Sequence, residues 1–277
     1  MNSLSQLWQS AQSNPSTLAM NPIPPPCWIC GKPAITGEHI TKRSDLRSVF
    51  GTVAQGHPLY QHRMTAANRR VGSLDAKVLK SPGLLCANCN NTRTQPHDRA
   101  WEKLSLALRT RKPALAPGDV VRTNRIFPFG TAGEMLKVHL YFVKLFGCHI
   151  SGNNIPLDIT RFSDAITYGK AHPNVYLRFG CGMTFAGKPM TGMSDMWLTP
   201  APPGGSSSFA TWFYYVDGLG INVMFATDGE RRDGLIGAWH PRHGTTRLTI
   251  ADFRFASRKR RSPIKPSPAV SLKHRCP

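Results

Sequence analysis

The longest regular hydrophobic pattern lies in the second half of the chain, where Glu134 to Phe146 carries apolar residues on nearly every helical face. A helix without a polar face should be buried. A second helix is predicted over about Thr160 to Gly169. Strands are predicted over about Asn174 to Phe179, Phe209 to Val216 and Leu219 to Ala226, the last two joined through an Asp217-Gly218 hairpin turn. Residues 126–256 therefore predict an α+β domain, whose sequence contains no motif with recognisable chemistry.

The first half shows shorter patterns. Trp101, Leu104 and Leu108 follow one another at spacings of three and four, which predicts one apolar stripe of a helix. A weak alternation from Ala34 to Ile40 predicts one arm of a short hairpin, with His39 at the end of a strand. The mixed segment between His39 and the second cysteine pair is expected to be loop-rich and to face DNA. Prolines then end the helical pattern, so we place a domain boundary near residues 112–125 and a first domain over 27–111.

Composition agrees with a folded but loop-rich chain. Apolar residues make up 40% of the 277 residues and charged residues only 18%, with 24 Gly and 23 Pro. Such proportions favour long irregular connections. The proline-rich residues 1–26 are expected to form a flexible lead. The basic residues 257–277 are expected to be a disordered tail, which either lies along phosphate or is solvated without a dedicated partner.

Charge is the strongest compositional signal. The chain has 35 Lys and Arg against 15 Asp and Glu, a formal net charge of +20. A field of this sign attracts polyanions, so nucleic acid, above all double-stranded DNA, is the expected partner. A membrane is not expected as a partner, because the sequence has neither a basic amphipathic helix nor an apolar run of about 18 residues. The N-terminus lacks the pattern of a signal peptide, and we expect a cytoplasmic protein.

Four of the seven cysteines form two CxxC pairs, Cys27 with Cys30 and Cys86 with Cys89. Four thiolates in two close pairs are the ligand set of a tetrahedral structural zinc site, which leaves no open position for catalysis. A thioredoxin-like redox role is disfavoured, because the two separated pairs lack a βαβ context. The remaining cysteines are interpreted as ordinary thiols of a reducing compartment: Cys148, Cys181 and Cys276.

Residues that could take part in hydrolysis lie beside both cysteine pairs. Glu38 and His39 follow the first pair, and Asn90 comes directly after the last cysteine. Phosphodiester hydrolysis needs a base for the attacking water and a cation near the leaving oxygen. His39 can serve as the base, while Glu38 and Asn90 offer oxygen ligands for a catalytic Mg²⁺ or Mn²⁺. Because neighbours on a strand point to opposite faces, we expect local backbone distortion here if both side chains share one site.

This order of motifs, CxxC, Glu-His-Ile and CxxCNN, resembles the HNH endonuclease family. The similarity is to its zinc-stapled, treble-clef-like ββα-metal members, which include phage junction-resolving enzymes, and it covers about residues 27–104. The resemblance implies a metal-dependent endonuclease that hydrolyses DNA. It also implies that Glu38 is the acid, His39 the general base and Asn90 the metal-binding amide, all close enough to share one phosphate. The alternative is a non-catalytic zinc protein that binds nucleic acid through a degenerate HNH site.

Some positions depart from the family pattern. Glu38 stands where Asp is common, and the middle Asn of the motif has no clear match, although Asn68 is a candidate with His62 behind it. Thr94 stands where some relatives have a second histidine. The other possible participants are Asn91, second to Asn90, and His97 or Asp98, of which Asp98 is equally well explained as a helix N-cap. Five further histidines are interpreted as structural or exposed: His139, His149, His172, His240 and His243.

Overall fold

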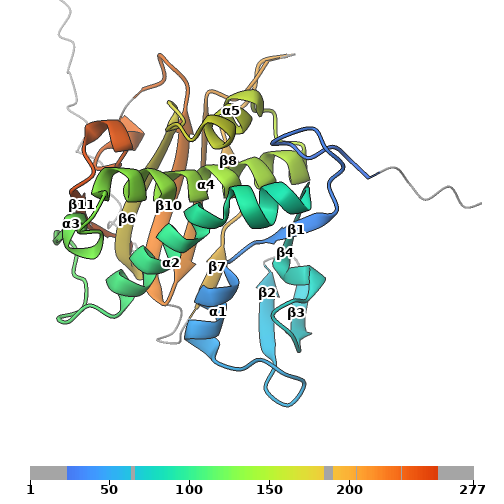
Figure 1. Cartoon of the computed structure of the whole chain (residues 1–277), viewed down its shortest axis with the longest axis horizontal. Helices are drawn as coiled ribbons and strands as arrows, with labels where there is room; N and C mark the ends of the chain where they lie inside the picture. The colour runs from blue at the N-terminus through green and yellow to red at the C-terminus, as the bar shows by residue number, and fades with distance from the viewer. Residues whose placement is uncertain (1–23, 64–65, 184–189, 204, 232, 255–277) are drawn as a thin grey trace, which may run out of the picture.

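The computed structural model has mixed α+β architecture, as the sequence predicts (Figure 1). It describes residues 24–63, 66–183, 190–203, 205–231 and 233–254. Most of the expected flexible lead and the whole expected basic tail lie outside the described residues.

The second half is organised around one largely antiparallel sheet, in the strand order β12-β6-β10-β9-β7 with β8 also paired to β9. The three longest strands agree with the predicted ones, although β6 extends further. Asp217 and Gly218 connect β9 to β10 with φ angles of 46° and 81°, as a two-residue hairpin requires. The strands are β6 (Val175–Met183), β7 (Thr191–Met193), β8 (Trp197–Leu198), β9 (Phe209–Val216), β10 (Gly218–Ala226) and β12 (Ala251–Asp252).

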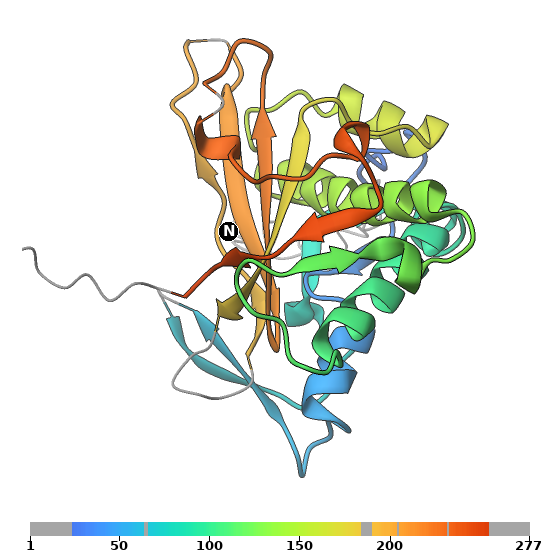
Figure 2. The same cartoon turned by 90° about the vertical axis from the view of Figure 1, so that its left-hand side faces the viewer.

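Helices cover one face of this sheet, as Figure 2 shows. The central helix α4 (Thr131–Asn153) is buried along most of its length, as its apolar pattern predicts. It continues past Phe146 through further buried residues and ends at Asn154, which has a left-handed φ of 50°. The predicted second helix is α5 (Thr160–Tyr168). No helix in the described ranges is both long enough and apolar enough to cross a bilayer.

The first half forms a smaller unit beside α4. Strand β1 (Thr36–His39) pairs antiparallel with β4 (Lys80–Leu85), and a π-helical turn, η2 (Asn88–Arg93), leads into α2 (Gln95–Arg109). The segment between β1 and β4 is more regular than the predicted loop-rich insert. It contains α1 (Arg43–Phe50), strands β2 (Leu59–Arg63) and β3 (Ala66–Val71), and the 3₁₀ turn η1 (Lys77–Leu79).

Helix α2 carries the predicted apolar stripe, since Trp101, Leu104 and Leu108 are all buried. The interpretation of Asp98 as an N-cap is wrong. The helix begins at Gln95, preceded by Thr94, so Asp98 lies inside the first helical turn. The cap of this helix has no side-chain hydrogen bond, and Asp98 instead forms ion pairs with Lys42 and Lys144.

Short elements connect the two halves. Strand β5 (Val120–Arg122), within the expected boundary near 112–125, pairs with β11 (Arg247–Thr249) near the end of the described chain. Helix α3 (Thr123–Ile126) follows directly, and two 3₁₀ turns, η3 (Asp233–Leu235) and η4 (Pro241–His243), precede β11. A continuous hydrophobic core runs from Cys27 and Ile29 through α2 and α4 to the sheet, so packing does not stop at that boundary.

Two close contacts fix this packing. A side chain at Gly147 of α4 would collide with the ring of Trp28 in the first knuckle, so glycine permits the helix to approach the knuckle. Asp45 of α1 is buried and accepts hydrogen bonds from Trp101 Nε1 (2.9 Å) and Tyr214 Oη (2.8 Å). It thereby ties α1 to both α2 and β9, and a buried carboxylate with such partners is costly to disrupt.

Candidate metal centre and active site

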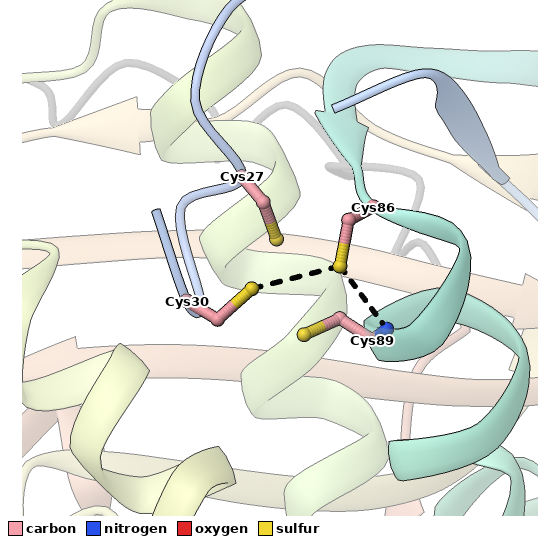
Figure 3. Close-up of side chains that lie close together, drawn as sticks. All are labelled: Cys27, Cys30, Cys86 and Cys89. Atoms are coloured by element: carbon pink, nitrogen blue, oxygen red, sulfur yellow. Dashed lines mark hydrogen bonds between the residues drawn. The ribbon is translucent and has the colours of Figure 1, made fainter. Parts of the chain in front are cut away.

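The four knuckle cysteines converge from two separate segments (Figure 3). Their Sγ atoms all lie within 4.8 Å of one another, and those of Cys30 and Cys86 are 3.5 Å apart. A tetrahedral zinc ion with Zn–S bonds of about 2.3 Å holds its sulfurs about 3.8 Å apart. The predicted cluster can therefore bind a structural metal such as zinc.

Local backbone geometry shapes each knuckle. After Cys30 the chain turns at Gly31, whose φ is 71°, and the Gly31 amide donates to the carbonyl of Cys27 at 2.8 Å. In the second knuckle the Cys89 amide donates to Cys86 Sγ at 3.4 Å. Desolvation alone would raise the pKa of Cys86, but this hydrogen bond and those with the neighbouring thiols lower it to about 7. A thiol near neutrality is readily converted to the thiolate that binds metal.

Glu38 points into the protein and is buried. Its carboxylate lies 3.1 Å from the Nζ atom of Lys144, a fully buried residue of α4. The same ammonium group donates to Asp98 at 2.6 Å. Burial favours loss of the Lys144 proton, but the two carboxylates outweigh burial and raise the pKa of Lys144 above its usual value. Lys144 is therefore charged and neutralises part of the acidic pair.

Asp98 connects this buried pair to the surface. Its second carboxylate oxygen lies 3.2 Å from Lys42 Nζ, which is also 3.5 Å from Glu102.

Lys42 and Glu102 border two adjoining grooves. One, of about 440 Å³, runs along α1 and is lined by Lys42, Arg43, Ser44, Arg47, Ser48 and Glu102. The other, of about 280 Å³, lies at the start of α2 and is lined by Lys42, Asn90, Asn91, Gln95, Asp98, Arg99 and Glu102.

His39 is half-buried at the end of β1, where its Nε2 lies 3.0 Å from the carbonyl oxygen of Leu74. A carbonyl can only accept a hydrogen bond, so Nε2 carries the proton of the neutral ring. The lone pair is then on Nδ1. This is the tautomer in which His39 can accept a proton from water.

Asn90 is half-buried at the start of η2. Its backbone amide donates to the carbonyl of Cys86 at 3.0 Å, and its side-chain Nδ2 donates to Thr36 Oγ1 at 3.2 Å. These bonds orient the amide side chain so that it lines the α2 groove together with Asp98. The metal knuckle thus positions Asn90 through the residue that directly precedes it, Cys89.

The three proposed catalytic residues are near the same knuckle but do not contact one another. Strand pairing is irregular between Gly37 and His39, which is the position where backbone distortion is expected. Within the described part of the chain, no hydrogen bond or ion pair joins any two of Glu38, His39 and Asn90. Glu38 contacts Lys144, whereas His39 contacts Leu74 and Asn90 contacts Thr36.

The remaining candidates divide between the groove and other places. Asn91 lines the α2 groove beside Asn90. Asn68 and His62 are exposed on the β2–β3 hairpin. His97 is buried, and its pKa is lowered to about 4 by burial and by the charge of Lys144. Thr94 donates to the carbonyl of Cys89 at 2.9 Å and so supports the turn.

Sequence reasoning missed the lysines of this site. Lys144 is the one charged residue in the most apolar part of its helix, between Val143 and Leu145. A charge at such a position is seldom fully buried without a partner, and this was the signal that could have indicated a buried acid nearby. Lys42, three residues after His39, offered no comparable signal.

The other histidines and cysteines lie away from the groove. His139, His172 and His240 are buried, as are Cys148 and Cys181. His172 donates its backbone amide to His139 Nε2 at 3.2 Å, and His240 Nε2 contacts the carbonyl of His172 at 3.0 Å. These contacts agree with the interpretation of the residues as structural.

No protein-family model, curated protein or solved structure matches the chain.

Proposed function

We propose that this protein is an HNH-type endonuclease that hydrolyses DNA, with His39 as the general base. The observation that carries the proposal is the contact between His39 Nε2 and the Leu74 carbonyl, because it fixes the tautomer whose Nδ1 can take a proton from water. His39 ends a strand near the cysteine knuckle and is half-buried, so part of the residue is exposed to solvent, although it lines neither groove. The protein's net charge of +20 favours a polyanionic substrate.

The adjoining grooves supply the contacts that a phosphate needs. Lys42 and Arg99 line the α2 groove, and Arg43 and Arg47 line the α1 groove. Cations at these positions can hold a phosphodiester and offset charge that builds on it during cleavage. Lys42 follows His39 by three residues, which keeps the proposed base and the phosphate-binding side chains close along the chain.

The residues present fit a catalytic divalent ion only in part. Asn90 and Asp98 line one groove, and their oxygens are ligands that Mg²⁺ and Mn²⁺ accept. Glu38, the expected third ligand, is already paired with Lys144. An ion held by Asn90 and Asp98 would supply positive charge at the scissile phosphate, whereas ligation by Glu38 requires that Lys144 release it.

The ion pair between Glu38 and Lys144 favours a second candidate, a zinc-stabilised protein that binds DNA without cleaving it. A buried ammonium group that neutralises the expected metal ligand is what a degenerate HNH site would contain. Both candidates use the same knuckle and the same two grooves. They differ in whether His39 and the α2 groove still perform hydrolysis.

A paired assay separates the candidates. Binding to a DNA duplex and nicking of supercoiled plasmid with Mg²⁺ or Mn²⁺ would be measured for the parent and for His39→Ala. His57→Ala is a matched control, because His57 is an exposed histidine of the same segment. The nuclease proposal expects equal binding by all three proteins and loss of nicking only in His39→Ala. Binding without nicking by the parent supports the second candidate, and no binding at all overturns both.

A further inference from the structure

We infer that the β2–β3 hairpin enters the major groove of double-stranded DNA and that its open face reads base edges. The inference rests on the proposed function in that it takes DNA as the partner, but it does not depend on cleavage. It gives a structural form and a groove to the segment between the two knuckles, which the sequence predicts as a loop-rich insert that faces DNA.

The paired strands β2 and β3 form a ribbon that stands apart from the rest of the fold. In Figures 1 and 2 it lies at the end of the molecule opposite α5, beside α1. Among the described elements, β2 and β3 pack mainly against each other. Its base is anchored, since Val71 is buried and Gln61 Nε2 donates to the carbonyl of Val78 at 3.3 Å. A two-stranded ribbon with a fixed base can present its side chains without collapsing onto the core.

The two faces of the ribbon differ. Opposite residues of an antiparallel pair share a face, so Tyr60 and Arg70 lie together on one face, and Gln61 and Arg69 on the other. The Gln61 side chain is turned toward the segment before β4, which marks its face as the attached one. Tyr60 is 60% exposed, and Arg70 is exposed and donates to the carbonyl of Gln55. The Tyr60–Arg70 face is therefore the open one.

The open face carries side chains suited to base edges. Arginine bonds guanine and asparagine bonds adenine through two hydrogen bonds each in the major groove. Arg70 lies on this face, and Asn68 is exposed in the part of β3 where the pairing with β2 is irregular, so the ribbon provides both types. Between residues 42 and 80 the sequence has Lys or Arg at eight positions and only two acids, Asp45 and Asp75. Asp45 is buried and Asp75 is paired with Arg43 at 3.0 Å, so the segment presents mainly positive charge to a phosphate backbone.

Ribbon geometry selects the kind of nucleic acid. The major groove of B-form DNA, about 12 Å wide, admits a two-stranded β-ribbon. The major groove of A-form RNA is too deep and narrow for side chains to read. A ribbon that acts through its face therefore fits duplex DNA and not duplex RNA.

The ribbon is also joined to the proposed base. Leu74, whose carbonyl contacts His39, comes only three positions after Val71, the last residue of β3. Three residues span at most about 11 Å. That reach is similar to the width of the major groove, so a ribbon seated in the groove brings His39 near one of the phosphate backbones that border it.

The test measures how tightly the protein binds three kinds of 24-base-pair duplex that share one pool of random sequences. Fluorescence anisotropy without divalent ions gives each affinity. The three probes are unmodified DNA, DNA with glucosylated 5-hydroxymethylcytosine, whose sugars fill the major groove, and duplex RNA. We expect the parent to bind both altered duplexes about tenfold more weakly or worse than unmodified DNA. Equal affinity for unmodified and glucosylated DNA would overturn the inference, as would equal affinity for duplex RNA.

Matched variants locate the effect. Asn68→Ala/Arg70→Ala should weaken binding to unmodified DNA about tenfold and remove most of the penalty for glucosylation. Asn124→Ala/Arg125→Ala removes the same two residue types from exposed positions in α3 and should leave both affinities unchanged. Identical behaviour of the two double variants contradicts the inference, and thermal melting controls for loss of fold.

The outcome is separable from that of the proposed function. If the parent binds DNA but tolerates glucosylation, the ribbon inference fails while His39 can still be the base. If glucosylation blocks binding but His39→Ala nicks plasmid as fast as the parent, the catalytic assignment fails and the ribbon inference stands. If the parent binds no duplex, both fail.

Discussion

Around the cysteine knuckles, which we call the knuckle region (residues 27–109), the buried carboxylates have cationic partners: Glu38, Asp45 and Asp98, paired with Lys144 and Arg109. Beside the sheet, in the sheet region (residues 120–252), histidines pack against aromatic rings: the buried His139, His172 and His240 and the half-buried His149. Helix α4 belongs to both, since it carries Lys144 toward the knuckle and His139 and His149 toward the sheet.

This difference indicates where chemistry can occur. Burying an ion is costly unless a partner neutralises it, so each ion of the knuckle region has a partner in place. The chain of pairs from Glu38 through Lys144 and Asp98 reaches Lys42, which borders both grooves. The described residues of the sheet region contain no comparable chain of ion pairs.

Loss of the metal should reduce stability more than any other change, and the knuckle region should unfold first. Cys86→Ser removes one of four sulfurs, and a structural zinc contributes on the order of 10 kcal/mol to the folding of small zinc modules. We expect one zinc per chain in the parent, none retained in the variant, and rapid hydrogen exchange over residues 27–104. Cys181→Ser, a buried cysteine of β6 outside the cluster, is the control. Retention of zinc by Cys86→Ser would contradict the assignment.

Acid should destabilise the sheet region next. Burial lowers the pKa of His149 to about 4 and that of His172 to about 3, and it lowers the pKa of His139 and His240 as well. The unfolded chain takes up these protons below about pH 6.5, whereas the folded protein does not, so stability is full above pH 6.5 and falls as pH decreases. For His149 and His172 the loss is about 2 kcal/mol each at pH 5.

Denaturant unfolding between pH 7.5 and 5 measures this loss. His139→Gln should reduce the slope of unfolding free energy against pH by about one proton, because one buried neutral histidine is gone. A pH-independent unfolding free energy over this range would show that the sheet histidines are not held neutral.

Removal of the buried lysine should have a smaller effect, confined to the knuckle region. Lys144→Met keeps the length of the side chain but leaves Glu38 without its cation and Asp98 with Lys42 alone, which should cost about 3 kcal/mol. Lys137→Met makes the same change on the same helix, where Lys137 forms a partly exposed pair with Glu134, and should cost less than about 1 kcal/mol.

Metal binding by the same variant sharpens the comparison. If the α2 groove holds a divalent ion, Mn²⁺ should bind Lys144→Met more tightly than the parent, because Glu38 and Asp98 become available as ligands. Titration calorimetry measures the difference. Equal or weaker Mn²⁺ binding by the variant would show that Lys144 does not occupy a potential metal site.

Much of the fold could be predicted from local patterns. The hairpin at Asp217-Gly218, the buried helix around Phe142 and the apolar stripe of α2 follow from turn chemistry and periodicity. The cysteine cluster followed from spacing alone, since CxxC pairs serve few other purposes in such a chain. Local rules set these features, so they do not depend on distant residues.

Features that depend on tertiary contacts could not be predicted. The insert has no strong periodicity, yet it contains the helix α1. Asp45 of α1 accepts hydrogen bonds from Trp101 and Tyr214, which lie far away in the sequence, so no local pattern indicates these contacts. Lys144 meets Glu38 across more than a hundred residues, and no short-range pattern announces that pair. The role of His39 likewise rests on Leu74, a residue without sequence signal.

The central claim is that His39 removes a proton from water during cleavage, and the initial rate of plasmid nicking by His39→Gly tests it most directly. General-base catalysis contributes about 10²- to 10⁴-fold, so the variant should nick at least about a hundredfold more slowly than the parent. Added imidazole should restore part of that rate without changing DNA affinity. A His39→Gly variant that nicks plasmid at the parent's rate would contradict the account.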